Sequence, residues 1–136
     1  MNSSYKIEKL SAIIIAKNEE NNIKRCLDSL TGCIDDIVVV VDKSSTDNTL
    51  TVVQGYNVNC IESEWLGYSK TKTLALENTQ HNWVLWIDAD ECLTEDLKNE
   101  LISLKNSETE FAVYKIARRA FFLGRWIPTT IFYPYS

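Results

Sequence analysis

Asp88 and Asp90 follow a short apolar run and offer two carboxylates separated by a single residue, Ala89. In an extended segment, side chains two positions apart point to the same side. Two adjacent carboxylates resist sharing a site unless a proton or a cation joins them. Oxygen ligands of this kind suit Mg²⁺ or Mn²⁺, which commonly hold a substrate diphosphate through one or two carboxylates. The pair therefore indicates a metal site, and the alternative is that both acids are solvated residues in the loop before Thr94.

Asp42 ends a second apolar run and precedes the hydroxyl-rich residues 44–47. A carboxylate at this point could accept hydrogen bonds from the N–H of a base or from ribose hydroxyls, or it could cap the following turn. Lys70 and Lys72 lie in a predicted helix and could reach phosphates as point charges, although lysines on a helix surface are usually solvated. These side chains suggest an anionic, nucleotide-like ligand.

The apolar runs before these acids predict the strands that must position them. We expect strands over Leu10–Ala16, Asp36–Val41, Asn57–Ile61, Trp83–Ile87 and Glu110–Ala117. Helical spacing predicts helices around Ile23 to Leu30, around Leu50 to Val53, over Gly67–Glu77, and after Thr94 as the N-cap. Alternating strands and helices imply an α/β fold, with a mostly parallel sheet covered by helices on both faces. Such sheets bind ligands beyond the carboxyl ends of their strands, where Asp42 and the Asp88–Asp90 pair fall.

The composition sets the limits on the class of protein. At 136 residues, with 45% hydrophobic and 24% charged residues, we expect one soluble globular domain. The net charge of −5 would repel a phosphate backbone and argues against binding nucleic acid. No apolar run is long enough for a signal peptide or a membrane span, so we expect a cytoplasmic location. Cys26, Cys33, Cys60 and Cys92 form no C-x-x-C pair, and we expect them to be buried and reduced rather than bound to zinc.

Four segments, taken in order, resemble the nucleotide-sugar half of family 2 glycosyltransferases with the GT-A fold, and more specifically the branch that adds sugars to the lipopolysaccharide core. They are "SAIIIAKNEENNIKRCLDSL", "DDIVVVVDKSSTDNT", "EWLGYSKTKTLALE" and "NWVLWIDADE". The resemblance implies a GT-A (Rossmann-like) architecture and a single nucleotide-sugar-binding domain over residues 1–136. It also implies that this is the N-terminal part of a longer enzyme whose acceptor half is largely missing.

The resemblance also implies roles for individual residues. It assigns the nucleotide pocket to Ala16, Lys17, Asn18 and Glu19, with Asp42 at the uracil or ribose and Lys72 near the nucleotide. Asp88 and Asp90 match the D-x-D motif, whose second acid typically coordinates the Mg²⁺ or Mn²⁺ cofactor.

Such enzymes invert the anomeric carbon. An acceptor hydroxyl, deprotonated by a carboxylate base, displaces the nucleoside diphosphate, and the metal stabilises the charge on the leaving group. The expected partners are a nucleotide sugar, such as a UDP-sugar, and a surface-glycan or glycolipid acceptor.

The chain departs from the family pattern in two places. Lys43 and Ser44 stand where the family often has a Gly, and the part that carries the acceptor site and usually the catalytic base would follow residue 136. We therefore name no catalytic residue and expect this chain to bind donor without transferring sugar at a useful rate. Aromatic residues crowd the C-terminal stretch: Phe121, Phe122, Trp126, Phe132, Tyr133 and Tyr135. They could begin the missing half, form a patch for a homodimer or for the inner face of the membrane, or pack as a compact ending.

Three other functions stay open. The chain could be a nucleotide-sugar binding module without transfer activity, which would bind donor but show no turnover. A phosphohydrolase that uses D-x-D normally places that motif after its first strand, whereas here it follows the fourth. An interaction protein that uses its aromatic end would bind a partner and ignore nucleotides.

Overall fold

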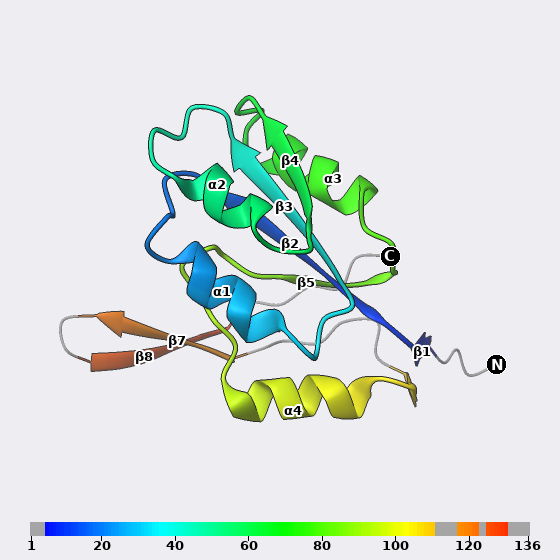
Figure 1. Ribbon diagram of the computed structural model, residues 1–136. Helices are drawn as coiled ribbons and strands as arrows, with labels where there is room; N and C mark the ends of the chain where they lie inside the picture. Colours follow the sequence, from blue (N-terminus) through cyan, green and yellow to red (C-terminus); the bar gives the residue numbers. More distant parts are fainter. Residues whose placement is uncertain (1–4, 111–116, 123–124, 131–136) are drawn as a thin grey trace.

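The computed structural model describes residues 5–110, 117–122 and 125–130 (Figure 1). The first half contains β1 (Tyr5–Ile7), β2 (Leu10–Ala16), α1 (Ile23–Leu30), β3 (Asp36–Asp42), α2 (Thr49–Gln54) and β4 (Asn59–Ser63). The second half contains α3 (Tyr68–Glu77), β5 (Trp83–Trp86), α4 (Glu95–Leu104), β6 (Ser107–Thr109), β7 (Ala117–Phe122) and β8 (Arg125–Thr130).

Four strands form a parallel sheet in the order β4-β3-β2-β5. The β-branched run of β3 lies in the middle of this sheet, and residues 38–42 are all buried. This burial on both faces explains why the run is continuous rather than alternating. The chain proceeds from β2 to β3 to β4 and then returns to the other side of β2 for β5. The strand order therefore reverses between β2 and β5, where open α/β sheets form their ligand crevice.

Helices cover both faces of the sheet, as the sequence predicts. Successive side chains of β2 point to opposite faces, so Ala12 and Ile14 pack with α1, α2 and α4, whereas Ile13 packs with α3. Figure 1 shows α1 and α2 on one side of the sheet and α3 on the other. The result is a three-layer α/β/α arrangement, and the predicted fold class is confirmed.

Helix α4 begins where the capping residue in the sequence predicts. Thr94 is the N-cap of α4, and its hydroxyl accepts a hydrogen bond from the Leu97 N–H at 3.2 Å. Glu95 and Asp96 occupy the first turn of α4, where the helix dipole favours acidic side chains. The helix predicted over Gly67–Glu77 begins one residue later, at Tyr68, because Gly67 has a φ of +87°, a backbone conformation that L side chains rarely adopt and that is not helical.

Some boundaries differ from the predictions. β4 begins at Asn59 rather than Asn57, because the Val58 N–H turns back to the Tyr56 carbonyl at 2.9 Å. β5 ends at Trp86, although the Ile87 N–H still donates to the Ile13 carbonyl at 3.2 Å. The sequence did not predict the antiparallel pairing of β1 with β6.

The predicted C-terminal strand and aromatic stretch lie largely outside the residues that the structure describes. Most of the predicted strand over 110–117 lies in residues 111–116, which are outside the described ranges, and Ala117 opens β7, which pairs antiparallel with β8. The side chains of the C-terminal aromatic stretch also lie outside the description. The single-domain assignment and the expectation for the aromatic stretch stay predictions.

The four cysteines are free thiols, but only Cys26 and Cys33 are buried, whereas Cys60 is half-buried and Cys92 is exposed. The expected burial is therefore wrong for Cys92, which lies in the loop before α4. None of the helices in the described ranges combines the length and the apolar character needed to cross a membrane.

Candidate active site

The loops that follow β2 and β3 are joined by hydrogen bonds at the carboxyl edge of the sheet. The Asn18 side-chain oxygen accepts from the Thr46 N–H at 2.7 Å, and the Asn18 N–H donates to the Ser45 hydroxyl at 3.3 Å. The Glu19 N–H donates to the Thr49 hydroxyl at 2.8 Å. Asn18 adopts a φ of +51°, which asparagine tolerates better than most residues. Two loops that are far apart in sequence thus form one polar surface.

A second set of contacts extends this surface along the β3–α2 loop. The Glu20 N–H donates to the Asp47 carboxylate at 3.1 Å, and the Glu20 carboxylate accepts from the Asn48 N–H at 2.6 Å. The Thr49 hydroxyl and N–H also lower the pKa of Asp47, with the hydroxyl as the larger influence. No ligand role is predicted from the sequence for Glu20, Asp47 or Thr49. Asp47 and Thr49 belong to the polar, hydroxyl-rich segment at the start of α2, whereas Glu20 precedes α1 and has no distinguishing pattern.

Asp42 ends β3 and is 5% exposed. Its Oδ1 accepts hydrogen bonds from both the N–H and the hydroxyl of Ser44, each at 2.8 Å. These two donors and the positive charge of Lys17 hold the pKa of Asp42 below its ordinary value. The carboxylate is therefore ionised and oriented by the turn, so the turn-capping alternative is realised. That contact uses one carboxylate oxygen and is compatible with a ligand at the other.

Asp88 and Asp90 lie in a tight turn after β5 rather than in an extended segment. The Glu91 N–H donates to the Asp88 carbonyl at 2.9 Å, and the Asp88 N–H donates to the Glu91 carboxylate at 2.9 Å. Ala89 is 3% exposed and anchors the turn in the core, while Asp88 and Asp90 are exposed. Within the described residues, the Asp90 carboxylate makes no hydrogen bond or ion pair. We call residues 88–91 the acidic turn.

The remaining predicted site residues differ in their surroundings. The Ala16 side chain is fully buried in the core, so only its backbone can face a ligand, whereas Lys17 is exposed. Lys72, on α3, places its ammonium 4.3 Å from the centre of the Trp86 ring at the end of β5. Lys17, Asn18, Glu19 and Asp42 are therefore brought together, whereas Lys72 lies over Trp86 on the face of the sheet that α3 covers.

The exposed side chains of Asp88 and Asp90 could hold a divalent cation together with a bound ligand. No group of three or more His, Cys, Asp or Glu side chains that could hold a metal forms within the described ranges. Mg²⁺ is usually held by one or two carboxylates, with waters and substrate phosphates completing its shell. Asp88 and Asp90 suit that kind of site rather than an all-protein cage.

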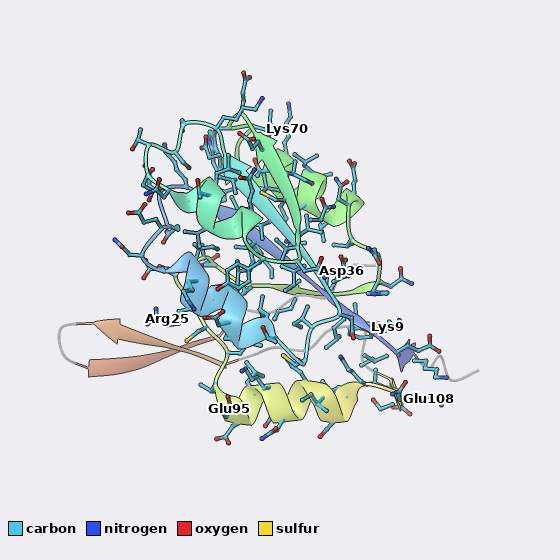
Figure 2. The ribbon with its side chains drawn as sticks, in the orientation of Figure 1. Lys9, Arg25, Asp36, Lys70, Glu95 and Glu108 are labelled. Atoms are coloured by element: carbon cyan, nitrogen blue, oxygen red, sulfur yellow. The ribbon has the colours of Figure 1, made fainter. Side chains whose placement is uncertain are left out.

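A polar hollow of about 470 Å³ lies at the other edge of the sheet, lined by residues 34–37, 57–59 and Gln80. Figure 2 shows Asp36, which lines this hollow, and Lys70, which lies near the carboxyl edge, at opposite ends of the sheet. The hollow is thus remote from the acidic turn and from Asp42. We place the candidate site at the carboxyl edge, because the chemically suitable side chains gather there.

Comparison with known proteins gives a consistent result. The chain matches the model of the family described as glycosyl transferase family 2 over residues 11–135. It is 37% identical over 120 residues to the lipopolysaccharide core biosynthesis glycosyltransferase LpsC of Rhizobium meliloti, which covers 85% of the chain and 44% of LpsC. It is also 37% identical over 112 residues to an uncharacterized glycosyltransferase of Rickettsia felis, covering 81% of the chain and 39% of that protein. The chain thus spans less than half the length of these curated relatives.

Two solved structures share the fold. TarS of S. aureus (residues 1–349) superposes with a TM-score of 0.61 and 28% identity over 70% of the chain and 31% of TarS. Glucosyl-3-phosphoglycerate synthase from Mycobacterium tuberculosis, solved in complex with Mn²⁺, uridine diphosphate and phosphoglyceric acid, superposes with a TM-score of 0.52 and 23% identity. That match covers 60% of the chain and 33% of the synthase. Both confirm the predicted GT-A architecture.

Proposed function

The chain belongs to glycosyl transferase family 2, and from that premise we propose that it binds the nucleotide-sugar donor of an inverting, metal-dependent transferase. One observation carries this proposal. The hydrogen-bonded loops after β2 and β3, together with Asp42 at the end of β3, lie at the same edge of the sheet as the acidic turn. The strand order reverses between these two regions, which is where α/β sheets bind nucleotides. We further propose that residues 1–136 form one donor-binding domain.

Asp42 is proposed to recognise the nucleoside, which we take to be uridine. Ser44 orients the carboxylate, and the lowered pKa of Asp42 keeps it ionised at neutral pH. An ionised carboxylate accepts hydrogen bonds from a base N–H or from ribose hydroxyls, but it donates none. Lys17, Asn18 and Glu19 form the adjoining wall, with Ala16 contributing its backbone.

Asp90 and Asp88 would hold Mg²⁺ or Mn²⁺. When bound, such an ion neutralises the charge that develops on the leaving diphosphate. The protein's own contribution is to present both carboxylates to solvent on a turn that buried Ala89 anchors. Lys72, beside Trp86, adds positive charge near the end of β5.

In the proposed transfer, an acceptor hydroxyl attacks the anomeric carbon from the face opposite the diphosphate, and the bond from that carbon to the diphosphate breaks, which inverts the configuration. The hydroxyl proton passes to a carboxylate base. We assign no catalytic base among the described residues. The similarity to LpsC leads us to propose a lipopolysaccharide-core or other surface-glycan acceptor. For such an acceptor we propose a cytoplasmic location at the inner face of the membrane.

Thermal unfolding of the chain with UDP, GDP or CMP, each with Mn²⁺ or with EDTA, tests the donor assignment. A ligand at 100 times its dissociation constant adds about 2.7 kcal/mol to the free energy of unfolding. We expect this stabilisation with UDP and Mn²⁺, and a much smaller effect when EDTA replaces Mn²⁺. The donor assignment fails if no nucleotide stabilises the chain in the presence of Mn²⁺.

A further inference from the structure

Helix α1 contacts the segment that contains the acidic turn at three points. The Arg25 guanidinium donates from Nη2 to the Asp90 carbonyl at 3.2 Å. The Cys26 thiol lies 3.6 Å from the Asp88 carbonyl, and the Ser29 hydroxyl accepts from the Leu93 N–H at 3.0 Å. Because residues three and four apart are neighbours on a helix surface, Arg25, Cys26 and Ser29 lie on one side of α1. Figure 2 labels Arg25 on α1.

Arg25 binds the backbone of the acidic turn rather than the Asp90 carboxylate. A guanidinium beside an aspartate commonly forms a two-pronged pair with the carboxylate, which would occupy the oxygens that a cation needs. Here the bond goes to the Asp90 carbonyl, and within the described residues no ion pair joins Arg25 to Asp88 or Asp90. The turn is therefore restrained through its backbone, and Arg25 does not pair with the Asp90 carboxylate.

Cys26 and Ser29 support the buried side of the same segment. Burial, followed by the negative charges of Glu91 and its neighbours, raises the pKa of Cys26 to about 12, so the thiol stays a donor at neutral pH. The Ser29 hydroxyl donates to the Cys26 carbonyl at 2.6 Å while it accepts from the Leu93 N–H. Of the three α1 residues that contact this segment, Arg25 is exposed, whereas Cys26 and Ser29 are buried.

The N-terminal end of α1 is also joined to the loop that follows β2. The Asn22 and Ile23 N–H groups both donate to the Glu19 carbonyl, at 3.0 and 2.8 Å. Glu19 in turn donates its N–H to Thr49 in the β3–α2 segment. Helix α1 is therefore bonded both to the loops that hold Asp42 in place and to the acidic turn.

We propose that Arg25 is a positioning residue: its hydrogen bond to the Asp90 carbonyl holds the acidic turn in the arrangement that takes a divalent cation together with a nucleoside diphosphate. The effect on metal binding rests on the proposed function, whereas the effect on the turn itself does not. Arg25 contacts neither ligand in this account and acts through the backbone of Asp90.

Isothermal titration of the 136-residue chain with UDP, at increasing Mn²⁺, tests the effect on metal binding. Loss of a group that orients metal ligands typically weakens metal affinity by 10 to 100-fold, and we expect about tenfold for Arg25→Ala, with metal-free UDP binding unchanged. Arg25→Lys, which keeps a donor, should recover part of the affinity. Lys24→Ala is the matched control, because it removes the same charge from the adjacent position, where Lys24 pairs with Asp28 instead.

Equal Mn²⁺ dependence in Arg25→Ala and the parent would overturn the proposal, and equal losses in Arg25→Ala and Lys24→Ala would assign the effect to charge alone. Amide hydrogen exchange, measured without ligand, separates this result from a failure of the proposed function. The Glu91 N–H, which is bonded to the Asp88 carbonyl, should exchange faster in Arg25→Ala than in the parent or in Lys24→Ala. If the parent does not bind UDP with Mn²⁺, the proposed function fails, and unchanged Glu91 exchange would still refute the positioning role.

Discussion

Asp36, at the amino end of β3, and Asp90, beyond the carboxyl end of β5, are acids at opposite edges of one sheet. Asp36 is buried, and its carboxylate accepts hydrogen bonds from the Ser11 hydroxyl and the Gln80 N–H, each at 2.8 Å. Asp90 is exposed, and its carboxylate makes no hydrogen bond or ion pair within the described ranges. The Asp36 carboxylate accepts hydrogen bonds within the fold, whereas Asp90 is held by its backbone and presents its charge to solvent.

Their neighbours in the sequence, Asp35 and Asp88, are both exposed. Asp35 accepts from the Leu10 N–H and from the Lys105 ammonium, each at 2.9 Å. Burial opposes ionisation of Asp35, but these two donors outweigh it and lower its pKa. Acidic residues alone therefore do not mark a site in this protein, and Asp90 differs from Asp35 and Asp36 because none of the described residues binds its carboxylate.

The largest effect on stability is expected at the amino edge. Asp36→Ala leaves the Ser11 hydroxyl and the Gln80 N–H without their charged acceptor, and we expect the free energy of unfolding to fall by about 3 kcal/mol. Urea denaturation measures this loss. Asp90→Ala, an exposed change, should alter stability by no more than about 0.5 kcal/mol. Similar losses in the two variants would remove the distinction between the edges.

Asp42 sharpens the comparison, because it is buried like Asp36 but lies at the carboxyl edge. Asp42→Asn keeps the shape and removes the charge and one acceptor. We expect UDP binding to weaken about tenfold, which corresponds to about 1.4 kcal/mol, with little change in its Mn²⁺ dependence. Calorimetric titration with and without Mn²⁺ provides the measurement. A loss of Mn²⁺ dependence alone would mean that Asp42, rather than the acidic turn, contacts the metal.

A smaller effect is expected from pH at the amino edge. The pKa of Asp35 is lowered in the folded state, so its contribution is present above the ordinary aspartate pKa of about 3.9 and is lost as pH falls below it. Lys105→Met removes one cause of that lowering and should flatten this part of the profile, by at most about 1 kcal/mol. Urea unfolding of both proteins between about pH 5 and pH 3 covers the window. Parallel profiles for the parent and Lys105→Met would contradict the assigned role of the pair.

The sequence predicts the elements whose signals are local. The run over Leu10–Ala16 has the same bounds as β2, and Thr94 caps α4, because burial on both faces and N-capping each leave a direct pattern in residue type. The placement of Asp42 and the acidic turn at one sheet edge followed from the strand order. Their chemical roles remain proposals.

The sequence does not predict features that depend on backbone partners or distant pairings. β1 and β6 have three residues each and are separated by most of the chain. Neither strand is long enough to show a recognisable alternation of apolar and polar residues. Arg25 donates to a carbonyl group, and since every residue has one, no residue type reports the contact. The different roles of Asp36 and Asp90 likewise depend on which donors the fold brings to each carboxylate.

The most direct test of the central claim is a count of bound Mn²⁺ in the presence of UDP. Electron paramagnetic resonance of free Mn²⁺ supplies that count for the parent, for Asp90→Asn, and for Asp96→Asn, which changes an exposed acid in the first turn of α4. We expect the parent and Asp96→Asn to bind Mn²⁺ together with UDP, and Asp90→Asn to lose that binding while remaining as stable as the parent. Mn²⁺ binding by Asp90→Asn equal to that of the parent would contradict the account.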